Sequence, residues 1–359
     1  MATPQSDTTP SLRVTGVIFS KDRPLQLDAT LRSLKRHCQD LASVSTKVIY
    51  AASSSRMLSL YRQLIREHPT ASEREIAWAL VEEISATRAG MLKHIFDAQH
   101  GKNGRLSIQT DPILYRNTDA LIQQALRFST LAPNMIVKIP ATNAGIAAFE
   151  EVTYRGVSVN ATVSFSLPQC IAVAEAVESG LQRREREGLD ISAMGPVCTI
   201  MVGRLDDWLK VQAEKRNITI EPGHLEWAGI AVFKKTYQLF RERGYRIRLL
   251  SAAYRNHMHW SEFIGGDVVI SPPCKWQKRF NASDVTVENR ISQPVDSKIV
   301  ADLTKKFPDF VRACTDGGIA VQDFDSFPPA VRTLRQFIEA CHELESQIRD
   351  FMLPNPDKL

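Results

Sequence analysis

The sequence lacks the features that mark several classes of protein. No apolar run approaches the roughly 20 residues that a membrane-spanning helix requires. The six cysteines lie far apart and form no metal-binding pairs, so we expect reduced thiols in a cytoplasmic protein. Residues 1–11 are polar and have no apolar core, which predicts a disordered tail and not a secretory signal. We therefore expect neither a membrane protein nor a disulfide scaffold.

The chain also has no large excess of one charge. It carries 45 Lys and Arg against 40 Asp and Glu, a net charge of +5, and the two signs are mixed along its length. This balance argues against a dedicated nucleic-acid surface but suits a small anionic substrate. We find no internal repeat and no linker in the 359 residues, which favours one domain.

The chain does have a regular alternation of apolar, β-branched segments with amphipathic helical ones. Eight segments are predicted as strands: 14–20, 47–52, 105–110, 135–139, 157–164, 197–202, 246–252 and 267–271. Ser72 and Glu75 have the spacing of a capping box at the start of a long helix over 72–99. Because helical sequence follows each strand, the α/β pattern predicts a (β/α)8 TIM barrel.

The predicted barrel occupies residues 12–295. The C-terminal part, 296–359, is predicted as a helical extension packed on the barrel. Its last helix, 329–352, is a candidate cover for the barrel or a contact in a homodimer.

Lys138 is unusual because it lies inside the apolar strand 135–139. A buried strand rarely carries an ammonium group unless something uses it. Burial lowers the pKa of a lysine, and a neutral amine attacks carbonyl carbons in Schiff-base chemistry. From this strand alone, a lysine that reaches solvent or pairs with a carboxylate is the commoner alternative.

Other polar residues gather at the predicted carboxyl ends of the strands, where such barrels place their chemistry. They are Asp22, Ser53, Ser54, Gln109, Asn160, Thr162, Thr199, Arg204 and Arg255. Guanidinium groups match phosphate oxygens in pairs and stay charged at working pH. With Lys138, the set favours a Schiff-base site for a sugar phosphate.

Four segments resemble those of transaldolases, in the same order over roughly half of the chain. They are Ile136-Val137-Lys138-Ile139-Pro140-Ala141-Thr142, Val159-Asn160-Ala161-Thr162-Val163-Ser164-Phe165-Ser166, Val202-Gly203-Arg204-Leu205-Asp206-Asp207-Trp208 and Ala253-Tyr254-Arg255-Asn256. The resemblance implies that Lys138 forms the Schiff base, that Asn160 binds the dihydroxyacetone unit and that Thr162 positions a water. It also implies that Arg204 and Arg255 bind the substrate phosphate.

The sequence departs from this family at the group expected to handle protons. Transaldolases present a glutamate on the third strand, whereas this chain has Gln109, which can hold a water but cannot take its proton. Fructose-6-phosphate aldolases also carry glutamine there, and Met201 stands where classical transaldolases have phenylalanine. Asp22 is therefore our candidate for proton transfer, with Ser53 or Ser54 near the place of the family's second-strand asparagine.

Two further patterns have competing interpretations. The segment 19–27 resembles the opening of GT-A glycosyltransferases, but it is short and no convincing Asp-x-Asp metal motif follows. We expect it instead to contribute to the first barrel strands. His257 and His259 could hold a metal, but without a third ligand we expect a polar loop over the site.

The sequence thus predicts a transaldolase-like enzyme that needs no metal and no cofactor. It would move a dihydroxyacetone unit between sugar phosphates, and a specialised form would build a seven- or eight-carbon sugar phosphate. The alternatives are an aldolase that releases free dihydroxyacetone, a catalytically silent barrel that binds a sugar phosphate or a protein, and a glycosyltransferase.

Overall fold

The structure, a computed structural model, describes residues 14–21, 44–51, 54–354 and 356, with side chains from residue 59 onward. The described residues form two compact units. One contains the described residues up to 63 together with 273–284, and the other contains 64–272 and the described residues from 285 onward.

The first unit contains a two-stranded parallel sheet. Strands β1 (Val14–Lys21) and β2 (Val44–Ala51) pair over their whole length, from Val14 opposite Val44 to Lys21 opposite Ala51. Helix α10 (Cys274–Asn281) lies against β1 within the same unit. Both predicted strands therefore form, and α2 (Ser54–Glu67) follows the second.

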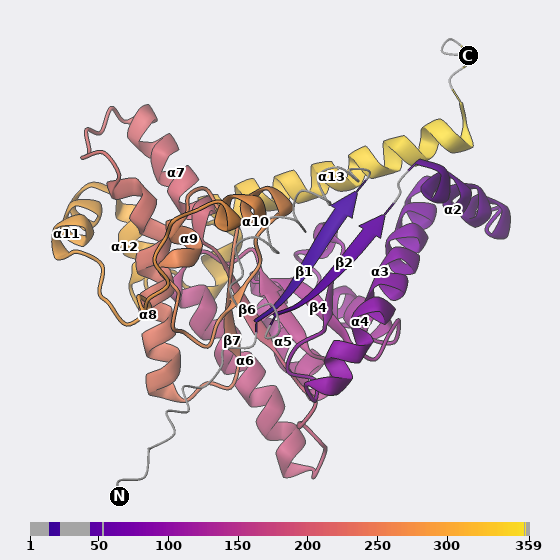
Figure 1. Cartoon of the computed structure of the whole chain (residues 1–359), viewed down its shortest axis with the longest axis horizontal. Coiled ribbons are helices and arrows are strands. Elements are labelled where there is room, and N and C mark those ends of the chain that lie inside the picture. Colours follow the sequence, from indigo (N-terminus) through magenta and orange to yellow (C-terminus); the bar gives the residue numbers. More distant parts are fainter. Residues whose placement is uncertain (1–13, 22–43, 52–53, 355, 357–359) are drawn as a thin grey trace, which may run out of the picture. The chain divides into compact units, whose positions relative to one another are not determined.

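The second unit is built on a curled, six-stranded parallel sheet (Figure 1). Its strands follow one another in chain order: β3 (Leu106–Gln109), β4 (Met135–Pro140), β5 (Val159–Thr162), β6 (Val197–Met201), β7 (Arg248–Ala252) and β8 (Val269–Ile270). All residues of β5 and β6 are buried, as expected for parallel strands covered on both faces. Its six strands are among the eight predicted from the alternating pattern.

The hydrogen bonds between the described strands do not close an eight-stranded barrel. Within the described part of the chain, β1 and β2 pair only with each other, and the larger sheet has six strands. Its last strand, β8, contains only two residues and so offers few backbone groups to a further strand. Strand β5 is also shorter than the predicted 157–164, because Val163 adopts a left-handed φ of 55° and ends the extended segment.

Helices connect the strands and pack against the sheet. In chain order they are α3 (Glu73–Ala98), α4 (Thr118–Ser129), α5 (Asn143–Tyr154), α6 (Leu167–Arg186), α7 (Val202–Lys215), α8 (Ala228–Arg243) and the short α9 (Met258–Ser261). Short 3-10 turns, η2 (Pro112–Leu114) and η3 (His224–Trp227), lie between them. The predicted capping box is confirmed: the Ser72 N–H donates to Glu75 Oε2 at 2.7 Å, and Glu75 N–H donates back to Ser72 Oγ at 3.3 Å.

The C-terminal part is helical, with α11 (Ser297–Lys306), α12 (Pro308–Cys314), η4 (Val321–Ser326) and α13 (Pro328–Met352). Four buried phenylalanines join these elements to apolar side chains of α7 and α8: Phe307, Phe310, Phe324 and Phe327. Helix α13 runs along α3, where Arg349 pairs with Glu73 at 2.6 Å. The C-terminal segment is thus part of the same core as the sheet.

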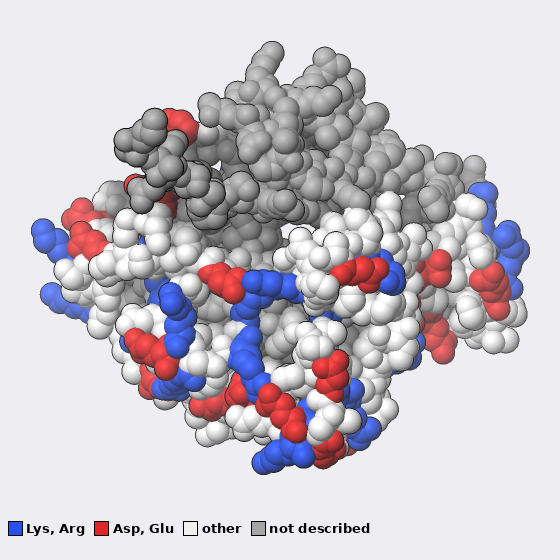
Figure 2. All heavy atoms as spheres, turned by 60° about the horizontal axis from the view of Figure 1, so that its bottom comes forward, with Lys and Arg blue, Asp and Glu red and all other residues white. Residues whose placement is uncertain are grey.

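The surface carries both charge signs side by side. Figure 2 shows Lys and Arg interspersed with Asp and Glu on the face that it presents. Among the described helices, none combines the length and apolar character needed to cross a bilayer.

Candidate active site

Lys138 lies in the middle of a row of polar side chains across three strands. The strand register places Gln109 of β3 opposite Lys138 of β4, and Lys138 opposite Asn160 of β5. Registered neighbours in a parallel sheet point to the same face, so the three side chains lie side by side. Gln109 is the last residue of β3, so the row lies toward the carboxyl end of the sheet.

The surroundings of Lys138 favour the neutral amine. Its strand neighbours Val137 and Ile139 are fully buried, and burial lowers the pKa of the Lys138 ammonium group. Lys138 forms no ion pair with any carboxylate in the described part of the chain, so the ion-paired alternative is not realised there. The side chain keeps partial exposure, which leaves a route for a small molecule. This environment suits a nucleophilic amine.

Asn160 is held on both sides by hydroxyl groups. Its Nδ2 donates to Ser107 Oγ at 3.0 Å, and its Oδ1 accepts from Thr199 Oγ1 at 2.7 Å. The structure therefore joins Asn160 with Thr199. Sequence reasoning missed Ser107, although it lies two residues before Gln109 in β3 and so must share its face.

Thr162 and Met201 lie together at the ends of β5 and β6. Thr162 is registered with Pro140, two residues beyond Lys138, and its hydroxyl is 3.9 Å from Met201 Sδ. Both side chains are buried. Thr162 thus belongs to the same end of the sheet as the lysine row.

Asp111, the first carboxylate after Gln109 in the sequence, is engaged by other groups of the protein. Asp111 is buried, forms a hydrogen-bonded ion pair with Arg74 of α3, and accepts the Ile113 N–H at 3.1 Å as the cap of η2. A carboxylate held in this way has a structural role and is not a free base. Asp22 and Ser53 lie outside the described residues, and Ser54 begins α2 without a described side chain.

A buried glutamine ties the ends of β4 and β5 together. Gln169, in the first turn of α6, donates from Nε2 to the carbonyls of Ala141 and Val163, both at 3.0 Å. Its Oε1 accepts from the Phe165 N–H at 3.1 Å and from Ser166 Oγ at 3.0 Å. These four bonds hold the left-handed Val163, a costly conformation for a β-branched residue.

Arg204 brings a poorly satisfied guanidinium group to the start of α7. Its Nε is buried and has no hydrogen-bond partner among the described residues, while Nη1 donates to Gln336 of α13. Burial, followed by the positive charge of Arg255, lowers the pKa of Arg204. Arg204 forms no ion pair among the described residues, and the first turn of α7 has no acidic residue. This environment favours an external anion.

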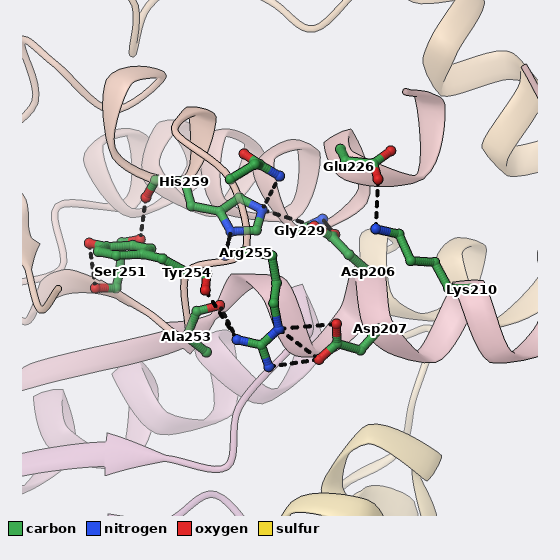
Figure 3. A network of polar contacts seen from close by, with 11 residues as sticks. Asp206, Asp207, Lys210, Glu226, Gly229, Ser251, Ala253, Tyr254, Arg255 and His259 are labelled. Atoms are coloured by element: carbon green, nitrogen blue, oxygen red, sulfur yellow. Dashed lines mark hydrogen bonds and ion pairs between the residues drawn. The ribbon is translucent and has the colours of Figure 1, made fainter. Parts of the chain in front are cut away.

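Arg255 follows β7 and is held by Asp207 of α7 (Figure 3). Its Nε lies 3.1 Å from Asp207 Oδ1, and its Nη2 lies 2.7 Å from Oδ2. Its Nη1 donates to the carbonyls of Ala253 and Tyr254, both at 3.2 Å. The side chain is 37% exposed, so a ligand can reach it. Together the two arginines offer the charge and donors that a phosphate requires.

The prediction for His257 and His259 was wrong in part. His257 is exposed, but His259 is fully buried and lies 2.8 Å from Asp206 Oδ2 through Nε2. Because the two residues lie at the start of the short helix α9, positions two apart point in very different directions. Within the described ranges, no cluster of three or more His, Cys, Asp or Glu side chains could hold a metal.

Comparison with known proteins identifies the family. The family described as transaldolase/fructose-6-phosphate aldolase matches residues 39–324. Transaldolase 2 of Streptomyces avermitilis is 42% identical over 120 residues, which are 33% of this chain and 32% of that protein. Transaldolase of Mycobacterium leprae is 34% identical over 162 residues, 44% of this chain and 43% of that protein.

These alignments span less than half of each relative's length. The glycosyltransferase-like segment 19–27 precedes the matched region and lies mostly outside the described residues. The family match itself extends over most of the chain and includes the lysine row, both arginines and the segments that join them. The chain belongs to the transaldolase/fructose-6-phosphate aldolase family.

Proposed function

We propose that this chain is a transaldolase that moves a dihydroxyacetone unit from a ketose phosphate to an aldose acceptor through a Schiff base on Lys138. The observation that carries the proposal is the buried Lys138 amine, which has no ion-pair partner among the described residues and lies between Gln109 and Asn160. The names of the relatives, all transaldolases, support the same activity.

The chemistry begins at Nζ of Lys138. The neutral amine adds to the ketose carbonyl carbon, and loss of water leaves a carbon–nitrogen double bond that is protonated on nitrogen. The bond between the α and β carbons, C3 and C4 of the ketose, then breaks. Its electron pair moves into the iminium to give an enamine, while the adjacent hydroxyl loses its proton and becomes the carbonyl of a released aldehyde.

The second half of the reaction reverses these steps. The enamine carbon attacks the acceptor aldehyde, whose oxygen takes up a proton, and water then releases the product and restores the amine. Holding the enamine away from solvent favours transfer over hydrolysis. In this scheme Asn160, fixed by Ser107 and Thr199, binds a hydroxyl of the three-carbon unit, and Thr162 positions the water.

The hydroxyl that becomes the aldehyde carbonyl must give its proton to a base, and the Gln109 amide cannot act as that base. We propose Asp22 for this role, with a water held by Gln109, and Ser53 or Ser54 as further substrate contacts. This assignment depends on β1 and β2 serving as the first two strands of an eight-stranded barrel. Their parallel pairing supports it, as does a family match that begins at residue 39 and so includes β2.

Arg204 and Arg255 are proposed to bind the substrate phosphate. The Nε of Arg204, which has no acceptor in the part of the chain that the structure describes, supports this role, because a buried guanidinium nitrogen without an acceptor gains from an anion. We also propose a cytoplasmic enzyme, and a homodimer that uses α13.

The alternative is an aldolase that releases free dihydroxyacetone. Gln109 favours this alternative, since fructose-6-phosphate aldolases also carry glutamine at that position. Product analysis with and without an acceptor aldose distinguishes the two activities. An extended acceptor supports the transaldolase, whereas free dihydroxyacetone at the same rate in both mixtures supports the aldolase. The same assay, run with acceptors of different length, tests synthesis of a seven- or eight-carbon product.

The Schiff base is tested by borohydride reduction with fructose 6-phosphate, followed by peptide mass analysis. We expect a three-carbon adduct on Lys138 in the natural chain. Lys138→Met should give none, while Lys93→Met, which removes an exposed lysine of α3, should behave like the natural chain. A catalytically silent barrel would give no adduct with any ketose phosphate, and that outcome would refute the proposal.

A further inference from the structure

A buried acid–histidine pair lies beside Arg255 (Figure 3). Asp206 of α7 and His259 of α9 have no exposed side-chain surface, and Asp206 Oδ2 is 2.8 Å from His259 Nε2. Neither residue takes part in the chemistry proposed at Lys138. Taking a carboxylate and an imidazole out of water costs free energy, and apolar residues often fill such a place at no loss of stability. The pair therefore needs a functional explanation.

The hydrogen bonds show what the pair connects. The backbone N–H of Arg255 donates to His259 Nδ1 at 3.0 Å, so Nδ1 is an acceptor and the ring proton sits on Nε2, facing Asp206. The other oxygen of Asp206 accepts the Gly229 N–H at 2.9 Å. A single carboxylate of α7 is thus linked to the start of α8 and, through His259, to the backbone of Arg255.

The first turn of α7 closely approaches the Arg255 loop. A Cβ added at Gly203 would lie 2.2 Å from the Ala253 carbonyl oxygen and 2.6 Å from Arg255 Cγ. Only glycine permits this approach without a shift of backbone. Ala253 itself holds a left-handed φ of 63°, so the loop leaves β7 by a constrained turn.

Two consecutive acids of α7 therefore hold two different parts of one loop. Asp206 reaches the Arg255 backbone through His259, while Asp207 binds the Arg255 guanidinium group directly. Arg204, which precedes them in the same helix, feels the positive charge of Arg255. Like charges repel, so the two guanidinium groups stay near each other only if the segments that carry them are fixed.

We propose that Asp206 and His259 are positioning residues that fix the Arg255 loop against the first turn of α7, so that Arg204 and Arg255 together fit one phosphate monoester. This inference rests on the proposed phosphate role of the two arginines. It adds that the pair sets the affinity for the phosphate group and leaves the chemistry at Lys138 unaffected.

His259→Gln tests the proposal. The Gln amide can still donate to Asp206 from near the position of Nε2, but it provides no acceptor for the Arg255 N–H. We expect affinity for inorganic phosphate, measured by calorimetry, to fall about tenfold or more, because a misplacement of about 1 Å in a functional group can cost up to about 100-fold. Adduct formation on Lys138 with unphosphorylated dihydroxyacetone should stay within about twofold of the natural chain.

Asp206→Asn is the second variant, chosen because it keeps the side-chain shape and removes a buried charge. In either orientation of the amide, an N–H group faces the Gly229 N–H or the His259 Nε2–H, so the connection is broken without a cavity. The same loss of phosphate affinity is expected. His224→Gln is the matched control, since His224 pairs with Asp302 at 3.0 Å through a bond that does not involve Arg204 or Arg255.

The outcomes separate the inference from the proposed function. Unchanged phosphate affinity in folded His259→Gln and Asp206→Asn overturns the inference, and so does an equal loss of phosphate binding and adduct formation. Absence of the Lys138 adduct in the natural chain overturns the proposed function instead. Because calorimetry does not depend on turnover, phosphate binding can be compared in either case.

Discussion

Gln169 offers a quantitative test of how the site is held in place. Replacing it by Leu removes two carbonyl contacts, to Ala141 and Val163, and leaves the Phe165 N–H without its acceptor. Each buried backbone group that loses its partner costs about 1–3 kcal/mol. Three such groups cost about 4 kcal/mol, and burial of the leucine side chain returns about 1 kcal/mol. We therefore expect a loss of about 3 kcal/mol in the free energy of unfolding.

Gln212→Leu is the matched control. Gln212 is also a buried helix residue, but its Nε2 makes one hydrogen bond, to Asp309 at 2.8 Å, and its Oε1 has no partner among the residues that the structure describes. Asp309 keeps its bond from Trp208 after the change. Loss of one hydrogen bond costs about 1 kcal/mol, which the leucine offsets, so a change near zero is expected.

Urea unfolding, followed by circular dichroism, compares the two variants. Gln169→Leu should also slow borohydride trapping at Lys138, because the ends of β4 and β5 lose their common anchor. If the two variants differed in unfolding free energy by less than about 1 kcal/mol, the four-bond account of Gln169 would be wrong.

Three further changes test other parts of the site. Lys138→Met should abolish trapping and raise the free energy of unfolding by about 1 kcal/mol near neutral pH. Because burial lowers the pKa of Lys138 on folding, the natural chain gains stability as the pH rises toward the pKa of lysine in the unfolded chain, so the advantage of the variant should shrink in alkali. Urea titrations at several pH values check this. Asn160→Asp places a carboxylate beside Lys138, which raises the pKa of the amine, so trapping at neutral pH should fall about tenfold and its pH profile should move upward. Gly145→Ala should prevent stable folding, since its Cβ would lie 1.8 Å from the Pro140 carbonyl oxygen. Gly90→Ala is the control, because its Cβ would have no atom within 4 Å, and thermal melts should show it to be neutral or stabilising by up to about 1 kcal/mol.

The strands could be predicted from sequence because their signals are local. β-branched runs and alternating helices identify all eight strands, and Ser72 with Glu75 identifies the start of α3. The row around Lys138 follows from the same signals, because parallel strands in chain order bring their carboxyl ends together. Local pattern was sufficient for this part of the site.

Other features depend on contacts between residues far apart in sequence. The partner of His259 lies 53 residues away, at Asp206, so the short His-x-His pattern suggested a loop and concealed a buried pair. Closure of the sheet likewise depends on hydrogen bonds between strands and not on the count of strands. Ser107 is different, since its position two residues before Gln109 is enough to put its side chain on the face that carries Gln109.

The contact between Arg204 and Gln336 has a consequence for the order in which the site assembles during synthesis. The two residues are 132 positions apart, whereas β3, β4 and β5, which hold the lysine row, are neighbours in sequence. A growing chain can complete the lysine row as soon as these strands have left the ribosome. The arginine region becomes complete only when α13 arrives, because Gln336 lies in that helix. A nascent chain therefore passes through a stage at which the amine can be in place while the arginines still lack their final contacts, and long-range contacts of this kind form slowly.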